Sequence, residues 1–216
     1  MPQDDTVAEI PPLLPQPRLI EKRDGTTQLS SDLRLATSNV LPYVRKTMRS
    51  ILAAADIRVV ANKKKFVVNV NIVSEDELDY GGVPEGARDD YSEITVENNV
   101  VTVCSAAQAG AVWGTQTFAN IYQALGPEVV IPNMRIRDWS TIGSRGVFLE
   151  SGWGLERMPL DGWYRWLDWL ARCKMSFLGV ELWGHAPFSA GEKPGEFLLV
   201  PFPDEPEFAS ENTLEW

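Results

Sequence analysis

Hydrophobic and polar residues follow two different periods along the first 130 residues of the chain. Apolar residues recur every three or four positions over residues 41–56 and again over residues 105–126, which predicts two amphipathic helices. The run 66–73 is rich in β-branched residues and predicts a strand. Two further strand-like runs flank Asn98 and Asn99. Because asparagine tolerates positive φ, this pair predicts a tight hairpin turn.

A different order of elements follows after residue 144. A short apolar run at 146–151 predicts a strand, residues 160–175 carry apolar positions at helical spacing, and residues 176–184 form a second, nearly continuous apolar run. Such a run is typical of a parallel strand that is covered on both faces. Strand, helix and strand in this order predict a βαβ unit with a right-handed crossover.

These patterns predict an α/β protein with two regions. Prolines fix φ and remove hydrogen-bond donors in residues 1–17, which we expect to form an extended arm. Residues 18–130 are expected to form an α+β accessory domain, a largely antiparallel sheet with two helices on one face. A linker is predicted over 131–144, and residues 145–216 are predicted to begin a second domain.

Composition excludes several classes of partner. The net charge of −10 argues against binding to nucleic acid and to anionic membranes, because both need clustered Lys and Arg. No stretch of about 18 apolar residues is present, so no transmembrane helix is expected. The N-terminus lacks a basic and an apolar segment, so it does not resemble a signal peptide. This slightly favours the cytoplasm, unless an export signal lies outside the chain.

The cysteines and the histidine give no sign of a metal or cofactor. Cys104 and Cys173 lie in apolar surroundings and are expected to be buried thiols rather than a disulfide. His185 is the only histidine, and no cluster of Cys and His is present, so we expect neither a metal site nor a cofactor.

Candidate binding residues follow the two strands predicted after residue 144. In parallel α/β folds, ligand groups come from the loops at the C-terminal ends of strands. Carboxylates accept hydrogen bonds from sugar hydroxyls, and an indole face packs against the C–H face of a pyranose ring. The two strand ends therefore predict a sugar-binding rim, formed by Glu150, Trp153, Glu181, Trp183 and His185.

Each of these residues also has a structural interpretation. Trp153 and Trp183 are equally suited to domain packing, and Glu150 to an ion pair. Glu181 is also suited to pointing inward and pairing with a neighbouring arginine. His185 can act as an acid or base, but a single histidine in a loop is more often only solvated.

Arg145 stands at the start of the first of these strands. Its guanidinium carries five donors in a fixed geometry and can reach substrate hydroxyls. Its alternative is an ion pair with Asp138 or Glu150.

Three segments together resemble the family 20 glycoside hydrolases, the β-N-acetylhexosaminidases. They are "AGAVWGTQTFANI" at 109–121, "IRDW" at 136–139 followed by Arg145–Gly146, and "DWLARCKMSFLGVELW" at 168–183. The resemblance covers most of residues 11–185. It implies an N-terminal accessory domain followed by a (β/α)8 TIM barrel. It also implies removal of terminal N-acetylhexosamine from glycans by a substrate-assisted, retaining mechanism, in which Arg145 and Glu150 contact the sugar.

The chain departs from the family pattern in two places. Ser151-Gly152-Trp153 and the second strand lack residues that the family usually has, which leaves a barrel glycosidase of other sugar specificity open. The family also cleaves with an adjacent Asp–Glu pair. Asp204–Glu205 lies instead in a proline-rich segment, so no catalytic residue is expected in this chain.

The 72 residues from Arg145 to Trp216 suffice for about two of the eight βα units of such a barrel. The chain is therefore expected to be the front part of a longer enzyme, whose partner is the C-terminal portion of the same barrel. Alone it is expected to be inactive and prone to self-association. The remaining alternative is a non-catalytic carbohydrate-binding or domain-docking module.

Overall fold

The computed structural model describes residues 7–61, 65–150 and 159–181. The chain divides into two compact units. Unit 1 comprises Met1–Arg145 and Trp166–Met175, and unit 2 comprises Gly146–Arg165 and Ser176–Trp216.

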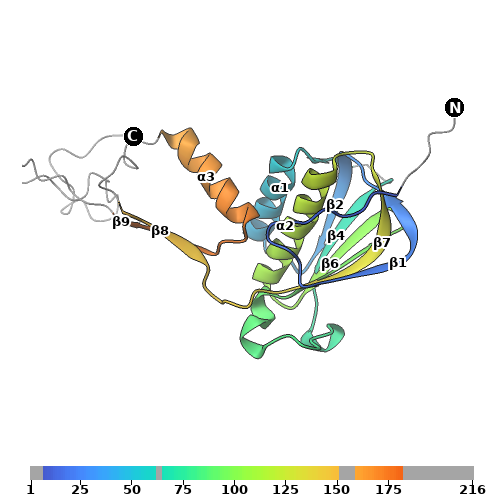
Figure 1. Ribbon diagram of the computed structural model, residues 1–216, viewed down its shortest axis with the longest axis horizontal. Coiled ribbons are helices and arrows are strands. Elements are labelled where there is room, and N and C mark those ends of the chain that lie inside the picture. The colour runs from blue at the N-terminus through green and yellow to red at the C-terminus, as the bar shows by residue number, and fades with distance from the viewer. Residues whose placement is uncertain (1–6, 62–64, 151–158, 182–216) are drawn as a thin grey trace, which may run out of the picture. The chain divides into compact units, whose positions relative to one another are not determined.

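Unit 1 is built on one sheet of seven strands in the order β1-β7-β5-β6-β4-β2-β3 (Figure 1). The pairs from β1 to β6 are antiparallel, and those from β6 to β3 are parallel. The predicted antiparallel character therefore holds for only half of the sheet. The strands are β1 Leu19–Gln28, β2 Asp32–Ser38, β3 Arg58–Val59, β4 Val67–Ile72, β5 Ser92–Glu97, β6 Val100–Ser105 and β7 Val130–Asp138.

Two helices, α1 (Pro42–Ala54) and α2 (Gln108–Leu125), cover one face of this sheet (Figure 1). Both helices were predicted from their apolar spacing, and both are confirmed. Their buried residues pack with the sheet into one hydrophobic core, which includes Met48, Leu52, Phe118 and Ile121. The accessory α/β domain expected from the sequence is thus present.

The turn between β5 and β6 follows the predicted chemistry, and glycine ends α2. Asn98 and Asn99 join β5 to β6 with φ of 52° and 63°, as expected for a two-residue hairpin loop. Gly126 ends α2 with φ of 86°, a conformation that glycine adopts without strain.

Helix α2 approaches the sheet closely at two glycines of the "AGAVWG" segment. A Cβ at Gly110 would lie 2.2 Å from the carbonyl oxygen of Tyr91, and a Cβ at Gly114 would lie 2.5 Å from a methyl group of Val103. Both positions lack room for a side chain, which gives this segment a physical reason for its glycines.

The predicted linker over 131–144 is wrong in its first half. Residues up to Asp138 belong to β7, which lies between β1 and β5 and buries Ile131, Met134 and Ile136. Pro132 lies within β7, paired with Thr26 where the register between β1 and β7 shifts at a bulge, a place where a missing N–H is tolerated.

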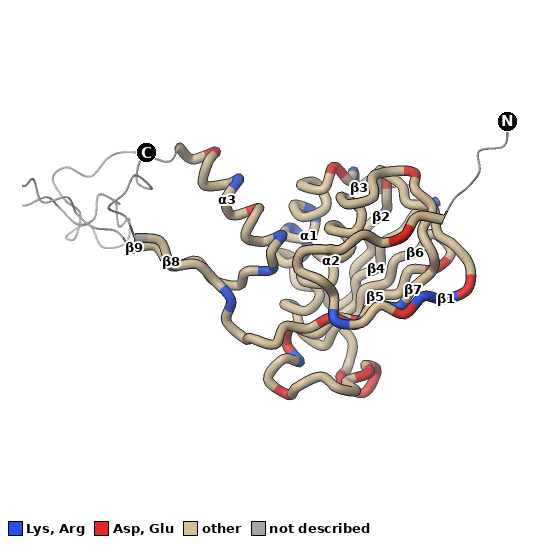
Figure 2. Tube along the Cα trace, viewed as in Figure 1, with Lys and Arg blue, Asp and Glu red and all other residues tan. Residues whose placement is uncertain are grey.

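The loop between β4 and β5 carries a second, smaller core. It contains two short 3-10 helices, η1 (Glu75–Glu77) and η2 (Glu85–Asp90). Figure 2 shows that acidic residues gather along this loop. The buried side chains beneath it are those of Val83, Ala87 and Tyr91, with Leu78, Tyr80 and Trp139 packed against them.

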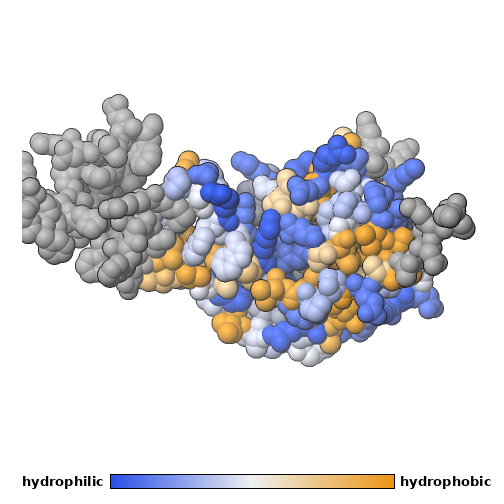
Figure 3. All heavy atoms as spheres, turned by 45° about the horizontal axis from the view of Figure 1, so that its top comes forward, coloured by the Kyte–Doolittle hydropathy of each residue, from blue (hydrophilic) through white to orange (hydrophobic). Residues whose placement is uncertain are grey.

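Unit 2 contains a parallel pair of strands, β8 (Gly146–Glu150) and β9 (Phe177–Glu181). Helix α3 (Leu160–Arg172) lies between them in sequence. The predicted strand, helix and strand are therefore present, with the strands parallel. Phe148, Phe177 and Val180 are 59%, 53% and 42% exposed, and Figure 3 shows hydrophobic surface at these strands. The predicted burial on both faces of the strands is not seen among the described residues.

Three expectations concern composition. Cys104 and Cys173 are free thiols, as predicted, although they are half-buried rather than buried. Within the described ranges, no group of His, Cys, Asp or Glu gathers in a way that could hold a metal ion. None of the described helices is both long and apolar enough to cross a membrane.

Candidate functional site

Half of the predicted sugar contacts lie outside the described residues, namely Trp153, Trp183 and His185. Glu150 and Glu181 are described only as strand residues. They end β8 and β9 and are paired with each other in the parallel register. The backbone therefore places these two predicted contacts side by side at the C-terminal end of the strand pair.

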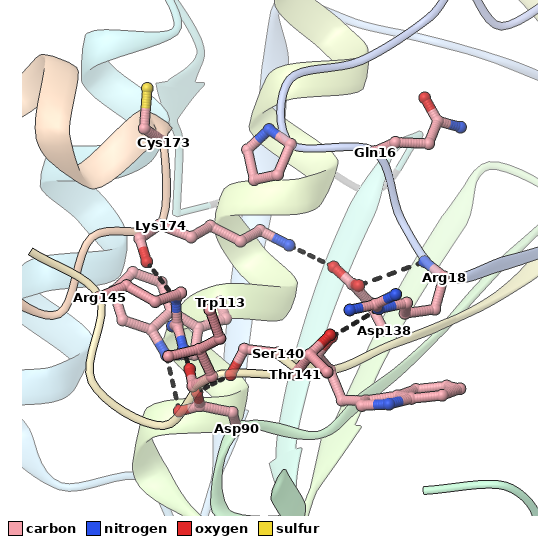
Figure 4. A pocket seen from close by; sticks show the side chains of 13 residues that line it. Gln16, Arg18, Asp90, Trp113, Asp138, Ser140, Thr141, Arg145, Cys173 and Lys174 are labelled. Atoms are coloured by element: carbon pink, nitrogen blue, oxygen red, sulfur yellow. Dashed lines mark hydrogen bonds and ion pairs between the residues drawn. The ribbon is translucent and has the colours of Figure 1, made fainter.

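Arg145 is the predicted contact whose side chain is described, and it lies beside a cleft of about 390 Å³ in unit 1 (Figure 4). The cleft combines aromatic walls with five charged side chains. Its lining includes Arg18, Asp90, Trp113, Asp138, Trp139, Ser140, Arg145 and Lys174.

Asp90, the last residue of η2, is the first of two carboxylates that organise the cleft. Arg145 donates from Nη1 to Asp90 Oδ2 over 2.8 Å, and Trp113 donates from Nε1 to Oδ1 over 3.1 Å. Ser140 donates from its hydroxyl to Oδ2. The side chains of Arg145 and Asp90 are only 18% and 17% exposed, so this ion pair is largely shielded from water.

Further contacts fix the orientation of the Arg145 guanidinium. Nε donates to the carbonyl oxygen of Lys174 over 2.9 Å, and Nη1 also donates to that of Ile142 over 2.7 Å. The guanidinium carbon lies 5.7 Å from the ring centroid of Trp113, within the range of a cation–π contact. Arg145 thus forms an ion pair with Asp90, a partner that was not considered from the sequence.

Asp138, at the end of β7, is the second carboxylate. Lys174 donates from Nζ to Asp138 Oδ2 and, over 2.5 Å, to Thr117 Oγ1. The backbone N–H of Arg18 donates to Asp138 Oδ1 over 3.3 Å. The Lys174 and Asp138 side chains are 10% and 11% exposed. Figure 4 shows the lysine side chain reaching across α2 to the carboxylate.

Sequence reasoning did not select Asp90, Asp138 or Lys174 as site residues. Lys174 lies two residues after α3, and no sequence pattern shows that it is buried or which carboxylate it meets. The partners lie 55 residues apart for Arg145 and Asp90, and 36 residues apart for Lys174 and Asp138. Each carboxylate is occupied by a cation and by further donors, so the arrangement is suited to holding chain segments together.

The comparisons with known proteins agree with this fold. Residues 10–139, more than half of the chain, match the family model described as glycosyl hydrolase family 20, domain 2. The chain belongs to glycosyl hydrolase family 20. The matched range ends directly after β7, so that strand is part of the family 20 domain. Among curated proteins, none matches the chain in sequence.

Solved structures of low sequence identity share the fold. A Flavobacterium johnsoniae chitobiase is 19% identical with a TM-score of 0.60, over 94% of this chain and 30% of its own. A Vibrio harveyi exo-β-N-acetylglucosaminidase, solved with N-acetylglucosamine, is 18% identical with a TM-score of 0.59, over 82% and 26%. A Streptomyces plicatus N-acetyl-β-hexosaminidase is 14% identical with a TM-score of 0.59, over 88% and 42%. The chain thus spans less than half of each of these structures.

A second charged network lies near the cleft in the family 20 domain. The backbone N–H of Gly81, 2.9 Å from Asp79, lowers the pKa of the Asp79 carboxyl, and the guanidinium groups of Arg137 and Arg135 lower it further. Tyr91 is fully buried and donates its hydroxyl to the carbonyl oxygen of Asp79 over 2.8 Å. Burial raises the pKa of the Tyr91 phenol, and the Glu93 carboxylate raises it further.

This raised pKa predicts a loss of stability in alkali. The folded protein keeps the phenolic proton of Tyr91 at pH values where the unfolded chain releases it, so stability falls as the pH rises above about 10. We expect Tyr91→Phe to reduce the slope of the unfolding free energy against pH between about pH 9 and 11. Burial also raises the pKa of Tyr80 and Tyr122, so part of the slope is expected to persist.

Urea unfolding at several pH values measures this slope. Tyr43→Phe, at a position that is 67% exposed, controls for the loss of one tyrosine hydroxyl. An unchanged slope in Tyr91→Phe would show that Tyr91 titrates alike in the folded and unfolded chains.

Proposed function

We propose that this chain is the N-terminal part of a glycoside hydrolase that removes terminal N-acetylhexosamine residues from glycans. The observation that carries the proposal is the family 20 match over residues 10–139, followed directly by a parallel strand pair that ends in two acidic residues. The similar solved structures named as an N-acetylglucosaminidase and an N-acetylhexosaminidase support the same substrate class.

We propose that the chain contributes substrate contacts rather than the catalytic acid. Glu150 and Glu181 accept hydrogen bonds from sugar hydroxyls, and Trp153 and Trp183 pack against the sugar ring. His185 adds a polar contact. The resemblance implies a sugar contact for Arg145 as well, a role that competes here with the ion pair to Asp90.

The proposed reaction is substrate-assisted and retaining. The carbonyl oxygen of the 2-acetamido group attacks the anomeric carbon while a carboxylic acid protonates the leaving oxygen. Water then opens the resulting ring on the same face from which the leaving group departed. We propose that the acid and the carboxylate that orients the acetamide belong to later strands of a (β/α)8 barrel begun by β8, α3 and β9.

The test is an assay of the full-length gene product that contains this chain, with a matched set of aryl β-glycosides. We expect turnover of the N-acetylglucosaminide and the N-acetylgalactosaminide. The glucoside, which lacks the acetamide nucleophile, should react at least about a hundredfold more slowly. The first sugar product, followed by NMR, should have the β configuration. Equal rates for glucoside and N-acetylglucosaminide, or an α product, would overturn the proposal.

The 216-residue chain by itself provides the second arm of this test. We expect it to show no turnover of the same substrates, because no catalytic acid is assigned within it. Turnover by this chain alone would refute the assignment of the catalytic acid to later strands.

A non-catalytic carbohydrate-binding module is the second candidate. The observation that favours it is the cleft itself, which is lined by the indoles of Trp113 and Trp139. Its carboxylates, Asp90 and Asp138, are both held by cations, so neither is free to act as a catalytic acid. Calorimetry with N-acetylglucosamine distinguishes the two candidates. Binding by the full-length product without any turnover would support the module over the hydrolase.

A further inference from the structure

We propose that Asp90 and Asp138 are positioning residues, which hold the chain at the two points where it leaves unit 1 for strands β8 and β9. The role assigned to the two strands rests on the proposed function, because their C-terminal ends carry the proposed sugar contacts Glu150 and Glu181. The anchoring itself rests on the contacts of unit 1 alone.

Arg145 and Lys174, the two cations held by these carboxylates, each lie just before one of the strands of unit 2. Arg145 is the last residue of the first segment of unit 1, and β8 begins at the next residue, Gly146. Lys174 is followed by Met175, the last residue of the second segment, and β9 begins two positions later at Phe177. Each strand is thus preceded, within three residues, by a cation held on a carboxylate of the family 20 domain.

Helix α2 supplies the surface on which both anchors are built. Trp113 donates to Asp90, and Thr117, four residues later, contacts both Asp138 and Lys174. Asn120 donates from Nδ2 to the carbonyl oxygen of Arg172 over 3.2 Å. Residues at this spacing lie on one face of a helix. A single helix face therefore positions both carboxylates and binds the end of α3.

The two anchors are also joined to each other. Arg145 Nε donates to the carbonyl oxygen of Lys174 over 2.9 Å, so the residue before β8 binds directly to the segment before β9 (Figure 4). With all four side chains less than one-fifth exposed, the ion pairs are protected from screening by salt. Arg145 thereby fixes the point at which the chain leaves unit 1 for β8.

Hydrogen exchange in the 216-residue chain, followed by mass spectrometry, tests the anchoring without requiring activity. Asp90→Asn keeps an oxygen that can accept from Trp113 but removes the charge that holds Arg145. We expect the amides of 146–150 to exchange at least about tenfold faster in this variant. Peptides from α1, β4 and β6 should stay within about twofold of the wild type.

Two further variants complete this test. Asp90→Glu keeps the charge and should restore most of the protection of 146–150. Asp161→Asn removes the carboxylate of an exposed pair with Arg165 and should change exchange at neither strand. Unchanged exchange of 146–150 in Asp90→Asn would overturn the proposal. Equally faster exchange in all peptides would also overturn it, because that result indicates a general loss of stability. If Asp90→Asn does not fold, Arg145→Gln removes the same ion pair from its other side. Faster exchange at 146–150 alone in Arg145→Gln supports the anchor, and a wild-type pattern there overturns it.

Kinetics of the full-length product separate positioning from direct contact by Arg145. If Asp90 positions the strand, Asp90→Asn lowers kcat/KM for the aryl N-acetylglucosaminide by at least about tenfold. If Arg145 instead binds the sugar, its release from Asp90 leaves KM unchanged or lower, which would contradict the proposed role. If the full-length gene product has no glycosidase activity, the proposed function is wrong. The hydrogen-exchange result would still decide whether Asp90 anchors the chain before β8.

Discussion

Asp138→Ala is expected to lower the free energy of unfolding of this chain by about 3–5 kcal/mol. The substitution leaves the Lys174 ammonium, whose side chain is 10% exposed, without its carboxylate. It also removes an acceptor from the backbone N–H of Arg18. A buried charge without a partner loses its hydration without compensation, which makes this one of the largest single-residue effects expected for the protein. Urea denaturation measures it.

Two comparison variants make the interpretation specific. Asp161→Ala breaks a pair with Arg165 whose side chains are 72% and 77% exposed, and should cost less than about 0.5 kcal/mol. Replacing Asp138 and Lys174 together by Leu and Met removes both charges and should recover much of the loss. Similar losses for Asp138→Ala and Asp161→Ala would show that the Lys174 ammonium is well hydrated in the folded chain.

Phe118→Ala is expected to cost about 3–5 kcal/mol of unfolding free energy. The Phe118 side chain is 1% exposed and lies on the sheet-facing side of α2, with its ring stacked on Phe66 at a centroid distance of 6.2 Å. Alanine removes the buried apolar area and leaves a cavity between helix and sheet, which the close contacts at Gly110 and Gly114 prevent from collapsing. Denaturant unfolding, checked against thermal unfolding, gives the loss.

Tyr43→Ala is the matched control for Phe118→Ala. Tyr43 lies on α1 and is 67% exposed, and alanine is at least as good a helix former, so the change should stay within about 0.5 kcal/mol. A loss below about 1 kcal/mol for Phe118→Ala would mean that helix and sheet repack around the missing ring.

Substitutions at Phe118 and at Asp138 are expected to affect different parts of the protein. Phe118 maintains the layer of α2 against the sheet, on which the whole family 20 domain depends. Asp138 holds Lys174 together with Thr117, the residue next to Phe118 on α2. A variant at Phe118 should therefore loosen the whole of unit 1, whereas the pairs of Asp90 and Asp138 act on the segments that enter β8 and β9.

The sequence by itself determined the local elements of this protein. The apolar spacing predicted α1 and α2, and Asn98 and Asn99 predicted the β5–β6 hairpin. These features depend only on the conformational preferences and the side-chain periodicity of residues that are neighbours in sequence, so they can be predicted without the tertiary structure. The motifs of 109–121 and 136–139 likewise sufficed to identify the family.

Only the tertiary structure decided which strands pair and which charges meet. It placed β7 between β1 and β5, although a linker was predicted there. It also paired Arg145 with Asp90 and Lys174 with Asp138. The choice among several acidic partners depends on the path of the backbone, since an ion pair needs atoms within about 4 Å whatever their separation in sequence. That path is set by the packing of α2 on the sheet, a property of the whole core that no local pattern records.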